Sequence, residues 1–302
     1  MQRQKRRRKK RKLSEIEDMI QYTKRNKKYN TLSKKLVNLN NMIGMTEVKE
    51  AVVEQLKFLI SNDGDTESHF LNTVITGNPG CGKTTLARLL YEIWSTLDVF
   101  KNEKSEFKIV TRSDLVGSYM GHTASKTRKL LNKHSGHVIF IDEAYSLCGS
   151  NKDDYGKECI DELTSFLSEE SGKTILIVAG YENQLNDHFF NVNSGLARRF
   201  NWTFNIKKYT VDELYKIFLY QLNKNKWKIK ENCIDLFQSN FDKMTNGGGD
   251  TSNIAFKCKL EYSKRTWKNA RERNKVITRE DVQKAMDKHL KKENVEVNHM
   301  YI

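Results

Sequence analysis

The sequence is poor in proline and in long apolar runs. One proline stands among 302 residues, which excludes collagen-like, proline-rich and mucin-like chains and favours a helix-rich fold. The longest apolar runs, 138–141 and 175–179, are far shorter than the roughly 20 residues that a helix needs to cross a bilayer. The basic start continues into LSEIED rather than into an apolar stretch. We therefore expect neither a membrane span nor a secretory signal.

Paired cysteines are also missing. The five cysteines are odd in number, scattered, and free of any CxxC pair. This pattern predicts free thiols in a reducing intracellular compartment, the cytoplasm or the nucleus. His134, His137 and Cys148 lack the spacing of zinc ligands, so we expect no zinc site.

Acidic residues are absent from the first twelve positions, MQRQKRRRKKRK, which contain nine lysines and arginines. These nine account for more than half of the net charge of +15 and leave +6 for the rest of the chain. Because a block of like charges repels itself, we expect a basic, disordered tail over residues 1–30, with a short helix as the alternative for its later part. The tail would bind nucleic acid, serve as a nuclear-import signal, or simply stay solvated.

Apolar runs of strand length alternate with helix-length segments through the middle of the chain. The runs lie at 73–76, 107–111, 137–141, 174–179 and 202–206. This alternation predicts an α/β fold with a parallel sheet covered on both faces. An amphipathic helix is expected within 36–60, and only helices after 210, at 210–224, 231–244, 252–270 and 278–292. We expect an α/β domain over 31–207 and a small helical domain over 208–302.

A phosphate-binding motif follows the first predicted strand. Residues 77–84, GNPGCGKT, match GxxxxGK[ST] in full and lead into a predicted helix. The glycines let the backbone turn its N–H groups toward phosphate, and the helix directs its positive end there. Lys83 would reach the β- and γ-phosphates, and the Thr84 hydroxyl would bind Mg²⁺. The expected nucleotide-binding set is Gly77, Asn78, Pro79, Gly80, Cys81, Gly82, Lys83, Thr84 and Thr85.

Two acids end the third predicted strand, in VIFIDE at 138–143. Acids that follow a buried strand are costly unless they have a role. Asp142 would hold the water shell of the metal ion. Glu143 would polarise the water that attacks the γ-phosphate, which indicates a hydrolase rather than a kinase.

The motifs in this order resemble those of AAA+ ATPases, and more narrowly those of the CbxX/CfqX group. That group includes red-type Rubisco activases and the stage V sporulation protein K, and it has relatives in large DNA viruses. The similar stretches are MIGMTEVKEAV, VITGNPGCGKTTLARLLYEIW, VTRSDLVGSYMGHTASKT, VIFIDEAYSL, YGKECIDEL, IVAGYENQL and NSGLARRF. The resemblance implies a P-loop AAA+ module with a five-stranded parallel sheet and an all-α lid. It also implies Mg²⁺-dependent hydrolysis of ATP and a hexameric ring.

The resemblance assigns two sites that act between subunits or on a substrate. Arg199 matches the arginine finger, which enters the ATP site of a neighbouring subunit. The family often reads GLRSRF where this chain reads GLARRF, so the choice between Arg198 and Arg199 is open. The segment Tyr119, Met120 and Gly121 matches the pore loop, whose aromatic tip can grip an extended polypeptide.

The resemblance also places residues around the nucleoside. Ile43 and Gly44 match the segment that covers the adenine. Where a polar sensor is common, at the end of the fourth strand, this chain has glycine and tyrosine, and Asn183 is only a weak substitute. No arginine stands where the lid usually supplies a second sensor, which leaves Lys257 or Lys259 for that role.

Three functions fit the sequence. The first is an oligomeric AAA+ ATPase that remodels a protein substrate. The second is an ATPase that acts on nucleic acid, which the basic tail and the Lys/Arg-rich stretch 257–275 favour. The third is a nucleotide-switched binding module that hydrolyses little, and the acid pair at 142–143 argues against it.

Overall fold

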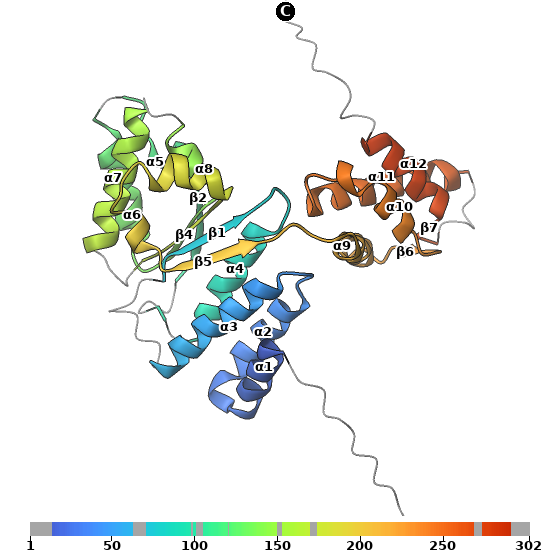
Figure 1. Cartoon of the computed structure of the whole chain (residues 1–302), viewed down its shortest axis with the longest axis horizontal. Helices are drawn as coiled ribbons and strands as arrows, with labels where there is room; N and C mark the ends of the chain where they lie inside the picture. The colour runs from blue at the N-terminus through green and yellow to red at the C-terminus, as the bar shows by residue number, and fades with distance from the viewer. Residues whose placement is uncertain are drawn as a thin grey trace, which may run out of the picture.

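The chain folds into a larger α/β part and a smaller, mostly helical part (Figure 1). The computed structural model describes residues 14–62, 71–97, 99–100, 105–119, 121–149, 153–169, 174–268 and 274–290. The segment that follows strand β5 joins the two parts. Within the described residues, no helix combines the length and the apolar character that crossing a membrane requires.

A five-stranded parallel sheet forms the centre of the larger part. The strand order is β2-β3-β4-β1-β5, and every neighbouring pair is parallel. The strands are β1 (Thr73–Gly77), β2 (Phe107–Val110), β3 (Val138–Ile141), β4 (Ile175–Gly180) and β5 (Trp202–Ile206). The prediction of a parallel α/β sheet is confirmed.

Both faces of the sheet are covered by helices, which explains why its inner strands read as continuous apolar runs. Alternate side chains of a strand point to opposite faces. Ile75 and Phe140 belong to the core shared with α3 and α4, whereas Val74 and Ile139 belong to the core shared with α6 and α7. The carboxyl ends of the strands therefore meet at one edge between two helical layers.

Helices cover the sheet; the first of them precede β1 in the chain, and the others lie between the strands. They are α1 (Glu15–Arg25), η1 (Lys27–Tyr29), α2 (Asn30–Asn41), α3 (Thr46–Ser61), α4 (Lys83–Trp94), α5 (Arg112–Leu115), α6 (Thr123–Lys133), η2 (Ala144–Leu147), α7 (Asp154–Glu169), α8 (Glu182–Leu185), η3 (Asn186–Phe190) and η4 (Ala197–Arg199). The amphipathic helix expected within 36–60 is two helices. They are separated at Met42–Met45, where Gly44 and Met45 have φ of 69° and 60°.

The prediction of a disordered tail up to residue 30 is wrong for the segment that begins at Ser14. A capping box formed by Ser14 and Glu17 starts α1, and Ile16 and Ile20 are buried in the same core as α3. Lys57 of α3 also pairs with Glu15 at 2.9 Å. The apolar residues recur at helical spacing within a charged segment, so the segment packs despite its composition. Residues 1–13, which hold the basic block, lie outside the described residues.

The smaller part consists of four longer helical elements around its own buried side chains. They are α9 (Val211–Asn223), α10 (Ile234–Ser239), α11 (Gly248–Thr266) and α12 (Arg279–Leu290), with the short η5 (Phe241–Lys243). The expectation that strands stop after 210 is wrong, because β6 (Lys228–Ile229) and β7 (Val276–Ile277) pair in parallel. Two-residue strands carry too little alternation to be seen in a sequence. We propose a boundary near residue 207, between the end of β5 and the start of α9.

Candidate functional site

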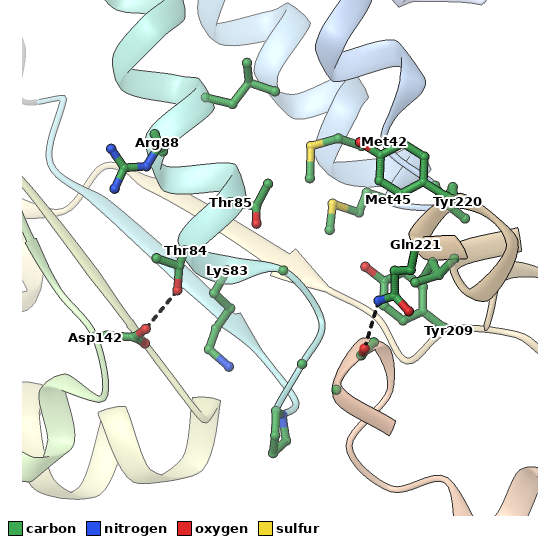
Figure 2. Close-up of a pocket in the computed structure, with 18 of the residues that line it drawn as sticks. Met42, Met45, Lys83, Thr84, Thr85, Arg88, Asp142, Tyr209, Tyr220 and Gln221 are labelled. Carbon is green, nitrogen blue, oxygen red and sulfur yellow. Dashed lines mark hydrogen bonds between the residues drawn. The ribbon is translucent and has the colours of Figure 1, made fainter. Parts of the chain in front are cut away.

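A cavity of about 950 Å³ opens at the carboxyl edge of the sheet. Its walls come from four regions: the segment between α2 and α3, the loop and helix that follow β1, the ends of β3 and β4 with the residues that follow them, and the helices α9 and α11 of the smaller part (Figure 2). In open parallel sheets, ligands bind at this edge. The location makes this cavity the candidate functional site.

The loop between β1 and α4 wraps around the position where a phosphate would sit. The Lys83 ammonium donates hydrogen bonds to the carbonyl oxygens of Gly77 at 2.8 Å and Asn78 at 3.0 Å. Lys83 is also the first residue of α4. The free N–H groups at the start of this helix lie next to the loop, where they can bind a phosphate. Gly80 has a φ of 65°, and a Cβ atom there would lie 2.1 Å from the Asn246 carbonyl oxygen. Only glycine fits this position.

The smaller part touches the phosphate loop directly. The Gly248 N–H donates to the Gly80 carbonyl oxygen at 3.1 Å. The Gln221 side-chain amide in turn donates to the Gly248 carbonyl at 3.1 Å (Figure 2). The Tyr209 hydroxyl donates to the Cys81 carbonyl at 2.7 Å, and burial raises the pKa of Tyr209 well above its usual value. The conformation of the loop therefore depends on both parts of the chain.

A metal site of the expected type is prepared on the sheet side of the cavity. The Thr84 hydroxyl donates to a carboxylate oxygen of Asp142 at 2.9 Å (Figure 2). Asp142 is half-buried and directly follows the last residue of β3, so its position is fixed by the sheet. Hydroxyl and carboxylate oxygens next to a phosphate position are the donors that Mg²⁺ prefers. These residues fit the metal ion that the sequence motif implies.

Glu143 is held in an unusual backbone conformation beside this metal site. Its φ of 51° places it in the left-handed region, which costs of order 1 kcal/mol or more for a non-glycine residue and is common at functional sites. Its side chain is exposed to the cavity. Tyr145 lies nearby, and burial, together with the Glu143 carboxylate, raises the pKa of Tyr145 to about 12. Tyr145 thus stays protonated and can donate to Glu143 at neutral pH.

The opposite end of the cavity is apolar and suits a nucleobase. Met42, Ile43 and Met45 line it from the segment before α3, and Ile217 and Tyr220 line it from α9. Flexible thioethers and an aromatic ring pack well on a flat aromatic base. The cavity therefore offers polar groups for phosphates at one end and an apolar surface for a base at the other.

Most residues predicted from the sequence meet in this cavity. Those that line it are Ile43, Pro79, Gly80, Gly82, Lys83, Thr84, Thr85, Asp142 and Glu143. Gly77 and Asn78 do not line the cavity, but their carbonyl oxygens accept hydrogen bonds from the Lys83 ammonium. The Cys81 side chain is buried, and burial raises the pKa of its thiol. Gly44 faces Glu213, whose carboxylate would lie 2.8 Å from a Cβ atom at that position.

The remaining predicted residues lie away from the cavity. Arg199 donates to the Gly195 carbonyl and to the Ser168 hydroxyl, each at 2.7 Å, whereas Arg198 is exposed. Tyr119 is 71% exposed, and Met120 lies outside the described residues. These positions are compatible with contacts to a second molecule, and their roles stay predictions.

At the sensor position after β4, Tyr181 lines the cavity and Asn183 does not, and the Lys83 ammonium lies 5.5 Å from the centre of the Tyr181 ring. The structure also adds lid residues that the motifs did not indicate. Lys257 and Lys259 do not line the cavity. The lid instead contributes Tyr209, Ile217, Tyr220, Gln221, Gly248 and Gly249. The glycine run at 247–249 was the one available signal, because glycines permit close backbone contact.

Comparison with known proteins gives a consistent result. Residues 73–207 match the model of the AAA family, the ATPase family associated with various cellular activities. The chain is 36% identical over 239 residues to a putative cfxQ-like protein of Acanthamoeba polyphaga mimivirus, covering 78% of this chain and 58% of that one. It is 35% identical over 232 residues to stage V sporulation protein K of Bacillus subtilis, covering 72% and 71%. A chloroplastic ribulose bisphosphate carboxylase/oxygenase activase of Cyanidioschyzon merolae is 32% identical over 213 residues, covering 68% of each chain.

Solved structures share the fold at lower identity. The RuvB Holliday junction branch migration motor of Thermotoga maritima aligns with a TM-score of 0.59 at 20% identity, covering 82% of this chain and 70% of that one. The AAA domain of FIGL-1 in complex with ADP aligns with a TM-score of 0.58 at 16% identity, covering 82% of each chain. The sequence matches and the geometry of the cavity agree: the chain belongs to the AAA family of ATPases, within its CbxX/CfqX group.

Proposed function

We propose that the protein hydrolyses ATP with Mg²⁺ in this cavity. The arrangement of Lys83, the Thr84–Asp142 pair and Glu143 around one phosphate position is the observation that carries the proposal. Mg²⁺, when bound by Thr84 and through water by Asp142, would neutralise charge on the phosphates. Glu143 would orient the attacking water and accept its proton, and Lys83 would hold the phosphates.

Replacing Lys83 by alanine is expected to weaken ATP binding by at least about 100-fold, because the loop loses the cation that binds the β- and γ-phosphates. Calorimetric titration with Mg·ATP measures the loss. Lys129, which is exposed on α6 and does not line the cavity, gives a matched control. Equal affinity in Lys83→Ala and Lys129→Ala would place the nucleotide elsewhere.

We further propose that the active form is a ring, with hexamer as the expected size, in which an arginine from one subunit completes the site of the next. Arg198 and Arg199 belong to the short η4, which precedes β5, and they lie away from the cavity of their own chain. Arg199 is held by neutral hydrogen-bond acceptors rather than by an acid, so little is lost when it exchanges them for a phosphate.

We propose protein remodelling as the work coupled to hydrolysis. Tyr119 is exposed at the end of a loop that α5 and α6 hold at its base, where Lys126 donates to the Ser113 and Val116 carbonyls at 2.6 and 2.8 Å. A rigid base with an exposed aromatic tip suits a grip on an extended polypeptide. The activase among the relatives is named for an action on another protein, which supports this choice.

Tyr119→Ala is expected to leave ATP affinity and basal turnover within about twofold, because Tyr119 contacts His122 rather than the cavity. Binding of a fluorescent unfolded polypeptide to the Glu143→Gln form with ATP is expected to fall about tenfold or more, as for a buried aromatic anchor. His122→Ala serves as a control that removes the ring neighbour and keeps the tip. Unchanged polypeptide binding in Tyr119→Ala would contradict the pore-loop assignment.

A nucleic-acid substrate is the second candidate, and the charge distribution favours it. The chain carries +15, α11 exposes Phe256 at 60%, and the last turn of the same helix contains Lys264 and Arg265. Binding of single-stranded DNA that falls steeply with salt and survives deletion of residues 1–12 would favour this candidate. Loss of DNA binding with the deletion would assign it to the tail alone.

A further inference from the structure

In the part of the lid that the structure describes, no cationic side chain lines the nucleotide cavity, and the lid contacts the phosphate loop partly through its backbone. The described lid residues that line the cavity are two tyrosines, an isoleucine, a glutamine and two glycines. Besides the Tyr209 hydroxyl, which donates to the Cys81 carbonyl, the contact consists of the Gly248 N–H, which donates to the Gly80 carbonyl, and of the close approach of Asn246 to Gly80. A backbone contact of this kind depends on whatever fixes the segment 246–249.

A buried carboxylate fixes that segment. Asp250, in the first turn of α11, is 1% exposed, and one of its oxygens accepts the Asn246 N–H at 2.7 Å. The Gly249 N–H closes the turn by donating to the Asn246 carbonyl at 2.9 Å. Asp250 therefore ties the start of the glycine run to the helix that follows it.

The second oxygen of Asp250 meets His289 at the end of the last described helix. His289 Nε2 lies 2.9 Å from Asp250 Oδ1, and His289 Nδ1 lies 3.4 Å from the Lys257 ammonium. With the proton on Nε2, the imidazole donates to Asp250 through Nε2 and accepts from Lys257 at Nδ1, so both ring nitrogens have a hydrogen-bond partner. Lys257 also donates to the Lys288 carbonyl at 3.0 Å, which joins α11 to the end of α12.

We propose that the Asp250–His289 pair is a positioning device for nucleotide binding. It holds the segment 246–249 against Gly80, and so links the C-terminal end of α12 to the phosphate loop. The peptide between Gly80 and Cys81 is bonded at both ends: its carbonyl accepts from Gly248, and its N–H donates to Asn78 at 3.4 Å. When the pair is broken, this peptide can rotate, and the N–H groups that receive phosphate lose their preorganised arrangement. The proposal rests on the proposed nucleotide site and adds the residues that hold it in shape.

A neighbouring ion pair provides a matched control. Glu261, which is 8% exposed, joins α11 to α12 through Lys288 at 2.6 Å and also pairs with Lys264 at 2.9 Å. Glu261 does not contact the segment 246–249. Glu261→Gln therefore loosens the same two helices without releasing the glycine segment.

The test measures Mg·ADP affinity by calorimetry and amide hydrogen exchange of residues 244–250 without nucleotide, in the full chain. His289→Ala is expected to weaken ADP binding about tenfold and to speed exchange of 244–250. His289→Gln, which keeps an N–H donor for Asp250, is expected to restore most of both. Glu261→Gln is expected to leave both unchanged, although it lowers the thermal midpoint.

Two results would overturn the proposal. One is ADP affinity in His289→Ala within about twofold of the parent chain, with unchanged exchange of 244–250. The other is equal weakening in Glu261→Gln, which would reflect general loosening of the lid. If the parent chain binds no ADP, the nucleotide site itself is contradicted, and faster exchange of 244–250 in His289→Ala would still show that the pair holds this segment.

Discussion

Replacing Arg199 by alanine is expected to leave ATP affinity nearly unchanged and to lower turnover by about 10³-fold or more. Arginine fingers supply 10³–10⁵ in rate, because their charge stabilises the transition state rather than the bound nucleotide. Arg199 lies outside the cavity of its own chain. Its loss should therefore slow hydrolysis only in the nucleotide site of the neighbouring subunit. Single-turnover hydrolysis at high protein concentration, together with equilibrium binding, separates the two effects.

The adjacent arginine is the matched control for this prediction. Arg198 is exposed in the same turn, and the same truncation there should change turnover little. A large loss in Arg198→Ala with normal turnover in Arg199→Ala would transfer the role to Arg198. Normal turnover in both variants and in the double variant would contradict a shared site.

Glu143→Gln is expected to bind ATP as the parent chain does and to hydrolyse it about 10²–10⁴-fold more slowly. The amide has nearly the same size as the carboxylate but cannot accept the proton of the attacking water. Glutamine also keeps an oxygen that can accept from Tyr145, so the local structure should persist. Phosphate release under saturating Mg·ATP measures the turnover, and calorimetry measures the affinity.

Glu182→Gln serves as the control for that change. Glu182 is exposed at the start of α8, close in sequence to Tyr181, and does not line the cavity. Its turnover should stay within about twofold of the parent chain, as for an ordinary surface substitution. If Glu143→Gln retained full turnover, another group would have to activate the water.

The phosphate end of the site could be predicted because it is local in the chain. One eight-residue motif contains Lys83 and Thr84, and its own glycines permit the turn that brings both residues to the phosphate position, although contacts from the lid also hold the loop. Asp142 could be placed because a buried parallel strand must end at the same sheet edge as β1. Features of this kind can be predicted from the order of the strands alone, and the alternation of apolar runs indicates that order.

The lid end of the site could not be predicted because it depends on tertiary packing. Gln221 lies on α9, and Gly248 lies 27 positions later at the start of α11, so no spacing rule connects them. The sequence offered Lys257 and Lys259 as cations for this end, but packing of α11 against α12 directs Lys257 to His289 instead. The packing of α1 could not be predicted for a similar reason: its charged composition hid a narrow apolar face that only the packing on α3 makes visible.

Mixing two inactive variants tests the central claim, a site completed by an arginine of the neighbouring subunit. Glu143→Gln keeps the arginine and lacks the catalytic carboxylate, and Arg199→Ala has the opposite defect. In a head-to-tail ring of randomly mixed subunits, about a quarter of the interfaces combine an intact Glu143 with an intact Arg199. The equimolar mixture is therefore expected to recover about a quarter of the parent turnover, whereas turnover no higher than the average of the separate variants would contradict the account.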